Sequence, residues 1–217
     1  MTHSVIPTGL ADEMIELRHR IHAHPELGFE EFATSDLVAE RLQSWGGTVH
    51  RGLGGTGIVA QLTAGDGGKR LGIRADMDAL PIHEATGLPY QSRIPVKRHA
   101  CGHDGHTAML LAAAKHLARE RCFSGTLNLI FQPAEEGLGA DGLIDGMVPL
   151  TGSEDFAFLL EQRPGCYLIV GNGNGEGEGE GEGEGGCMVH NPGYDFNDAV
   201  LPTGASYWVK LAETFLV

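Results

Sequence analysis

Apolar positions in the first half of the chain recur with the period of helices and then with that of strands. Spacings of three and four residues predict a helix over 10–24, which Pro25 ends, and a second helix over 32–45. Shorter apolar runs bounded by glycines predict three strands, over 48–51, 57–63 and 71–77.

The second half of the chain alternates helices with strands. A loop with three prolines occupies 80–100, and an alanine- and leucine-rich helix over 107–119 leads to an apolar strand over 126–131. The remaining predicted elements are a short helix over 139–148, a helix from an N-cap at Ser153 to Leu160, a strand over 166–170 and a final helix over 204–217. This alternation predicts an α/β layer structure with a largely parallel sheet.

The composition is that of an acidic globular protein. Hydrophobic residues make up 41% of the 217 residues, and the formal net charge is −14 at pH 7. Five of the acidic residues belong to a glycine–glutamate repeat within 171–186, which predicts a flexible loop whose charges repel one another. The rest of the chain is still acidic, so we expect no binding to nucleic acid or to an anionic membrane.

The sequence pattern contains no segment typical of membrane insertion or export. No apolar run approaches the roughly 18 residues of a spanning helix, and residues 1–7 lack the basic and apolar regions of a signal peptide. The cysteines at 101, 122, 166 and 187 are unpatterned, so we expect thiols, one of them a candidate metal ligand. We therefore expect a cytoplasmic protein.

One glycine motif has a structural interpretation. Residues 52–57 match the G-x-G-x-x-G pattern of dinucleotide-binding loops. The apolar run that follows is a strand, however, and not the helix whose N-terminus would bind a pyrophosphate. We interpret the motif as a hairpin turn.

Three polar clusters indicate where chemistry could occur. Asp76 and Asp78 end one apolar strand, 132–137 follows another and contains the pair Glu135 and Glu136, and 99–106 directly precedes a helix. Sites in open α/β sheets lie outside the carboxyl ends of the strands. We therefore expect the three clusters to meet in one crevice.

The residue types in these clusters favour a divalent metal. Thiolate and imidazole are good zinc ligands, and the single residue between Cys101 and His103 lets both face the same side of an extended segment. Adjacent residues of an extended chain point apart, so Glu135 and Glu136 are expected to differ in role. One would ligate the metal while the other takes a proton from the attacking water.

Other interpretations of the same residues remain open at this point. Cys101 with His103 or His106 could form a nucleophile and its base. The glutamate pair could be a solvated surface feature, the two aspartates could cap a loop, and the Cys-x-His pattern could be accidental. His24, which precedes Pro25, is a candidate to support the site from behind.

Six motifs together resemble a known family. The segments are IHAHPELGFEE at 21–31, RADMDALP at 74–81, HACGHDGH at 99–106, QPAEEG at 132–137, GSEDF at 152–156 and HNPGYDFND at 190–198. In this order they resemble the metal-dependent amidohydrolases of the hippurate hydrolase and indole-acetyl-amino-acid hydrolase branch of the aminoacylase/carboxypeptidase-G superfamily. The resemblance implies a three-layer, zinc-peptidase-like catalytic domain with a mostly parallel central sheet flanked by helices.

The resemblance also implies roles for individual residues. Cys101, His103, Glu136 and His190 correspond to ligands of a dinuclear metal centre, binding zinc or manganese. Glu135 corresponds to the general base, and Asp78 supports the site. The implied reaction is hydrolysis of small-molecule N-acyl amino acids at the amide bond.

The sequence departs from this family in the middle of the chain. Members carry an inserted lid and dimerisation domain with a further metal-binding histidine, whereas here 147–150 runs directly into 151–156. We expect a single catalytic domain over 1–217 built from two family segments, 1–148 and 149–217, with its oligomeric state open because the family's dimer contacts lie in the missing domain.

Four protein donors are enough for one metal ion but leave a pair of ions under-coordinated. We therefore expect weak or mononuclear metal binding, unless His99 or His106 substitutes for the missing ligand. The alternative function is a catalytically impaired metal-binding remnant or a partner-binding protein.

Overall fold

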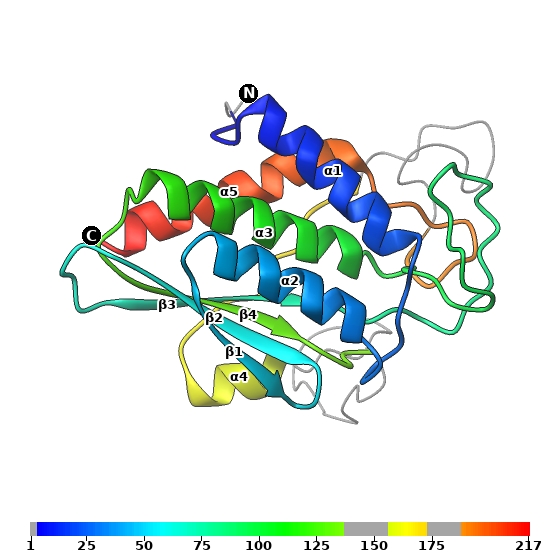
Figure 1. The fold of residues 1–217 in the computed structure, drawn as a ribbon, viewed down its shortest axis with the longest axis horizontal. Coiled ribbons are helices and arrows are strands. Elements are labelled where there is room, and N and C mark those ends of the chain that lie inside the picture. The colour runs from blue at the N-terminus through cyan, green and yellow to red at the C-terminus, as the bar shows by residue number, and fades with distance from the viewer. Residues whose placement is uncertain (1–3, 137–155, 173–187) are drawn as a thin grey trace, which may run out of the picture.

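The computed structural model describes residues 4–136, 156–172 and 188–217 (Figure 1). The described helices are α1 (Thr8–His22), α2 (Phe32–Ser44), α3 (His103–Glu120), α4 (Phe156–Gln162) and α5 (Leu201–Phe215), with a 3-10 turn η1 (Asp198–Val200) before α5. The described strands are β1 (Thr48–Leu53), β2 (Gly57–Ala64), β3 (Arg70–Asp76) and β4 (Gly125–Gln132).

Most of the elements predicted from periodicity are confirmed, with small shifts of their ends. The final helix begins at Leu201, earlier than expected, because Pro202 occupies its first turn, where a missing N–H breaks no helical hydrogen bond. The predicted strand over 166–170 is wrong: this segment is exposed and pairs with no strand in the described residues. The elements expected at 139–148 and the cap at Ser153 lie outside the described residues, as does the repeat from 173 onward.

The sheet is mixed, which corrects the expectation of a mostly parallel one. Its strand order is β1-β2-β4-β3, and only the β3–β4 pairing is parallel. The glycine motif forms the tight β1–β2 hairpin turn, as expected, and a connection this short can join only antiparallel strands. β4 enters the sheet between β2 and β3, so it is antiparallel to one and, through the crossover α3, parallel to the other.

The main core lies between the sheet and the helices on one of its faces. Figure 1 shows α1, α2, α3 and α5 on this side and the short α4 on the other. Alternate side chains of β4, Leu127, Leu129 and Phe131, are buried in one cluster with Leu110 and Leu117 of α3. No helix in the described part of the chain is both long and apolar enough to cross a membrane.

Candidate metal centre

The parallel pairing of β3 and β4 brings the carboxylate clusters together. Asp76, the last residue of β3, lies opposite Gln132, the last residue of β4. The chain that leaves β3 therefore places Asp78 beside the chain that leaves β4 with Glu135 and Glu136. The N-terminus of α3 begins at the same edge with His103, so the convergence expected from the sequence is present.

His103 lies at the centre of this group and is almost completely buried. Its Nδ1 faces the carbonyl oxygen of Asp78 at 2.9 Å and the Oδ1 of the same residue at 3.2 Å. A proton on Nδ1 satisfies these acceptors and leaves Nε2 as the ligating nitrogen. Nε2 faces a carboxylate oxygen of Asp76 at 3.8 Å, of Glu135 at 3.7 Å and of Glu136 at 3.8 Å.

The electrostatics around His103 favour a cation. Burial alone would lower its pKa, but Asp76 and Asp78 raise the pKa of His103 well above its ordinary value. Burial acts in the opposite sense on Asp76, yet His103, His106 and Arg74 hold the pKa of that carboxyl far below its usual range. Several ionised carboxylates therefore share one buried imidazole, and a divalent ion would neutralise this excess of negative charge.

A second group of donors joins residues far apart in the sequence. Sγ of Cys101, a carboxylate oxygen of Glu136 and a ring nitrogen of His190 lie within 4.8 Å of one another. Burial raises the pKa of the Cys101 thiol to about 11, and a bound metal would be needed to favour its thiolate. Thiolate, imidazole and carboxylate are the donors that zinc prefers.

Glu136 supplies the observation that tests whether a metal fits. Its Oε1 is buried and makes no hydrogen bond, although Nε2 of His190 lies only 3.2 Å away. The contact is close, but its geometry is not that of a hydrogen bond. A buried carboxylate oxygen without a hydrogen bond, surrounded by a thiol and an imidazole, is what a metal ligand looks like when its ion is removed. The residues present therefore fit a divalent metal.

The segment around His190 is anchored by the backbone. His190 adopts a left-handed conformation, with φ of 64°, and its N–H donates to the carbonyl of Ala100 at 2.6 Å. The buried guanidinium of Arg98 donates to the carbonyls of Pro192 and Tyr194. These contacts tie the far C-terminal segment to the segment that carries Cys101.

The two glutamates do not point apart, because the chain leaving β4 is not extended. Ala134 has a φ of 55°, and Glu135 and Glu136 lie in a turn. The N–H of Ala134 donates to the buried Glu31 at 2.8 Å, and the other carboxylate oxygen of Glu31 accepts from Thr56 at 2.6 Å. Both glutamates thus approach His103, but only Glu136 also belongs to the group with Cys101 and His190.

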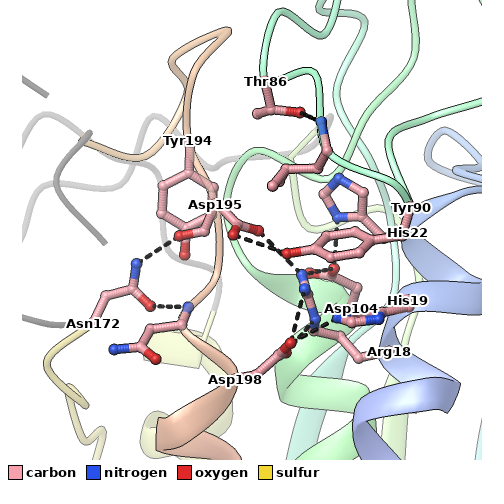
Figure 2. Close-up of polar contacts among 12 residues, drawn as sticks. Arg18, His19, His22, Thr86, Tyr90, Asp104, Asn172, Tyr194, Asp195 and Asp198 are labelled. Atoms are coloured by element: carbon pink, nitrogen blue, oxygen red, sulfur yellow. Dashed lines mark hydrogen bonds and ion pairs between the residues drawn. The ribbon is translucent and has the colours of Figure 1, made fainter. Parts of the chain in front are cut away.

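Behind the centre lies a buried ionic network that the sequence did not reveal (Figure 2). Nδ1 of His22 lies 2.8 Å from Asp104 and its Nε2 lies 3.2 Å from Glu84, while Arg18 donates to Asp104 at 3.3 Å. Burial would lower the pKa of His22, but Asp104 and Glu84 raise it to about 9. The expectation for His24 is wrong, because this residue lies just beyond the end of α1 with its side chain exposed, where its Nδ1 lies 3.1 Å from the carbonyl oxygen of Arg20.

His99 and His106, the two histidines considered as replacements for the missing metal ligand, differ in position. Nδ1 of His106 lies 2.7 Å from Asp76 at the edge of the centre. His99 is buried, its ring nitrogens make no hydrogen bond, and it belongs to none of the donor groups found in the described residues. Of the pair, only His106 is placed to reach a metal.

Comparison with known proteins shows similarity in sequence to a peptidase family and to several hydrolases. Residues 72–148 match peptidase family M20/M25/M40. The hippurate hydrolase of Campylobacter jejuni is 52% identical over 156 residues, which are 71% of this chain and 40% of that protein. The IAA-amino acid hydrolase ILR1-like 5 of Arabidopsis thaliana is 45% identical over 139 residues, 63% of this chain and 32% of that protein.

Two solved structures share the fold. A putative aminohydrolase from methicillin-resistant Staphylococcus aureus superposes with a TM-score of 0.60 at 42% identity, over 64% of this chain and 37% of that one. The Bacillus subtilis YxeP protein, a dinuclear metal-binding peptidase of the M20 family, gives 0.58 at 37% identity, over 62% and 38%.

The chain thus spans 40% or less of the length of these relatives. Within that span the resemblance read from the motifs is confirmed: the chain carries sequence of a peptidase family M20/M25/M40 domain and is homologous to the hippurate and IAA-amino acid hydrolases.

Proposed function

We propose that this protein is a metal-dependent amidohydrolase that cleaves the amide bond of N-acyl amino acids. The observation that carries the proposal is a pair of overlapping donor groups that share Glu136: one joins it to Cys101 and His190, and the other joins it to His103 and Glu135. The names of the similar proteins, hippurate hydrolase and IAA-amino acid hydrolase, support this substrate class.

In this proposal Cys101, His103, Glu136 and His190 hold zinc or manganese. When bound, the ion polarises the amide carbonyl and lowers the pKa of water at the site. Asp78 positions two of these ligands, because its oxygens face Nδ1 of His103 and accept the N–H of Glu136 at 2.9 Å. Such contacts fix the orientation of a ligand before the metal arrives.

Glu135 is the proposed general base. It is buried, and its Oε2 lies 3.7 Å from His103 Nε2, so it borders the centre without joining the group of Cys101 and His190. In the proposed reaction its carboxylate accepts a proton from the attacking water and returns that proton to the leaving nitrogen. The reaction yields a carboxylic acid and an amino acid.

The domain organisation and the cellular location are part of the same proposal. We propose one catalytic domain built from 1–148 and 149–217 and a cytoplasmic location. The junction between the two segments lies outside the described residues.

The test compares the two adjacent glutamates. Hydrolysis of hippurate and of N-acetyl amino acids is measured with added Zn²⁺ or Mn²⁺, together with metal affinity by calorimetry. Glu135→Gln is expected to lower kcat by about 10²–10⁴-fold while metal affinity is retained, because the base is not a ligand. Glu136→Gln is expected to lower both.

Glu40→Gln, an exposed position on α2, is the matched control and should change neither quantity. Identical behaviour of the two site variants would refute the division of roles.

A wild-type chain that binds metal and hydrolyses none of these substrates would instead favour the metal-binding remnant. A Cys101 nucleophile predicts that alkylation, and not metal removal, abolishes turnover. Burial acts against this third function, because it raises the pKa of the thiol.

A further inference from the structure

Glu31 lies at the start of α2, but its side chain does not cap that helix. The residue is completely buried, and it makes no side-chain hydrogen bond to the helix N-terminus. Its two carboxylate oxygens accept hydrogen bonds from two other segments. Oε2 accepts from the hydroxyl of Thr56 in the β1–β2 turn at 2.6 Å, and Oε1 accepts from the N–H of Ala134, just beyond β4, at 2.8 Å. A buried carboxylate thus joins α2 to the chain that carries the proposed general base.

The backbone at Ala134 depends on its surroundings. Its φ of 55° lies in the left-handed region, which is unfavourable for a residue with a Cβ and persists only where neighbouring groups fix it. Ala134 is also buried, so its N–H needs an acceptor within the protein, and Glu31 supplies one. A Cβ on Gly28 would lie only 3.0 Å from Cα of Ala134, so the segment that leads into α2 packs directly against this turn.

The conformation of this turn determines where two functional carboxylates lie. Ala134 directly precedes Glu135 and Glu136, so a change in its backbone would move both side chains relative to the centre. The N–H of Glu136 donates separately to Asp78 at 2.9 Å. Glu135 therefore lies between two anchored N–H groups, one bound by Glu31 and the other by Asp78. Loss of the Glu31 contact should displace Glu135 more than Glu136.

We propose that Glu31 is a positioning residue of this site: it fixes the turn at Ala134 and so directs the carboxylate of Glu135 at the attacking water. This inference rests on the proposed function, in which Glu135 is the general base. Glu31 acts only through the turn, because it is completely buried and both of its oxygens are occupied by Thr56 and Ala134. The role requires a hydrogen-bond acceptor at the right distance and not a negative charge.

The competing explanation is that Glu31 only joins α2 to the β1–β2 turn, which would affect stability but not the turnover of the folded protein. Three substitutions separate the two roles. Glu31→Gln keeps the length and an acceptor for Ala134, while its amide can donate to the oxygen of Thr56. Glu31→Asp keeps the charge but is one methylene shorter, and Glu31→Met removes the acceptor. Burial raises the pKa of Glu31, so the neutral glutamine suits this site.

The experiment measures kcat and KM for hippurate, Zn²⁺ affinity by calorimetry, and hydrogen exchange of the Ala134 amide in the chelator-stripped chain. In Glu31→Asp and Glu31→Met we expect kcat to fall about 10²-fold, the effect of displacing a catalytic group by about 1 Å. KM should not change, because the base acts in the transition state. Zn²⁺ affinity should fall much less, since Glu136 keeps its contact with Asp78. The Ala134 amide should exchange faster. Glu31→Gln should keep all four quantities near the wild type.

Glu30→Met, at the adjacent exposed residue that pairs with Lys97, is the matched control and should change none of these quantities. Circular dichroism at the assay temperature establishes that each variant is folded, and if Glu31→Met unfolds, Glu31→Asp decides. Wild-type kcat in either of these variants, or an equal loss in Glu31→Gln, would overturn the proposal. A wild type that hydrolyses neither hippurate nor N-acetyl amino acids would refute the proposed function, and exchange of the Ala134 amide would still decide whether Glu31 holds the turn.

Discussion

At the scale of single residues, Asp78 shows how one buried side chain organises the centre. Its carbonyl and its Oδ1 face His103, and its Oδ2 accepts the N–H of Glu136. Burial would raise its pKa, but the hydrogen bonds from His103 and from the Glu136 backbone lower the pKa of Asp78. The carboxylate is therefore ionised, and it orients two proposed ligands at once.

Asp78→Asn is expected to reduce metal affinity about tenfold, because contacts behind a ligand contribute about 10–100-fold and the backbone carbonyl of residue 78 still faces His103. Calorimetric titration with Zn²⁺ measures the change. Asp36→Asn, on an exposed side chain of α2, should leave the affinity as it is. Equal affinity in Asp78→Asn and the wild type would mean that Asp78 does not support the centre.

At the scale of elements, the C-terminal segment packs closely against the start of α3 because two positions there carry no side chain. Gly102 has a φ of 95°, and a Cβ there would lie 2.9 Å from the hydroxyl of Tyr194. A Cβ on Gly105 would lie 2.4 Å from the ring of the buried Phe196. These glycines allow the segment that follows His190 to lie against the helix that carries His103.

Gly105→Ala is expected to destabilise the fold by about 1–3 kcal/mol, since overpacking against a buried ring outweighs the better helix propensity of alanine. Thermal unfolding should then occur several degrees lower, at about 2–4 °C per kcal/mol for a chain of this size. Gly9→Ala in α1, where nothing lies within 4 Å of the new Cβ, is the control and should not lower Tm. A wild-type Tm in Gly105→Ala would show that Phe196 moves aside freely.

At the scale of the whole molecule, the buried ionic network joins three parts of the chain that are far apart in sequence: α1, the start of α3 and the C-terminal segment. Figure 2 shows Arg18 and His22 of α1 meeting Asp104 of α3 and Asp195 and Asp198 of the C-terminal segment. Removing one partner from such a network leaves a buried charge uncompensated. The stability of the fold therefore depends on the protonation state of the residues in this network.

His22 makes this link dependent on pH. Its pKa in the folded state is about 9 against an ordinary value of 6.5, so the stabilisation is complete below pH 6.5 and is lost as the pH rises through 9. Glu84, with a pKa lowered to about 2, loses its contribution as the pH falls below 4.5. Near His22, Asp104 stays ionised and His99, whose pKa burial lowers to about 4, stays neutral at alkaline pH.

The stability advantage of the wild type over His22→Asn is therefore expected to be largest between pH 4.5 and 6.5 and to shrink between pH 6.5 and 9.5. Thermal melts across this range measure the difference in Tm, and groups common to both proteins cancel. Parallel curves for the two proteins from pH 6 to 9.5 would contradict a charged His22.

Local sequence patterns were sufficient to predict most of the helices and strands and part of the candidate site. Helical and strand periods depend only on neighbours in sequence, which is why α1, α2, α3 and β4 lie where the pattern places them. Cys101, His103, Glu135 and Glu136 could be singled out because their donor atoms follow strands or precede a helix. The strand predicted at 166–170 failed because an apolar run is a strand only where a partner strand receives it.

Burial partners and strand neighbours were decided by the tertiary structure. His22 and His24 are two residues apart and look equivalent in the sequence, yet His22 is buried as the last residue of α1, and His24, just beyond the end of the helix, is exposed. The buried hydrogen bonds of Glu31 arise only when the start of α2 meets the β1–β2 turn and the chain that leaves β4. The approach of His106 to Asp76 arises only when α3 packs against the end of β3. The sequence by itself determined which donors exist and where helices and strands form, because both are local properties. Folding decided the mixed sheet and the pairing of the donors, because contacts between distant segments set both.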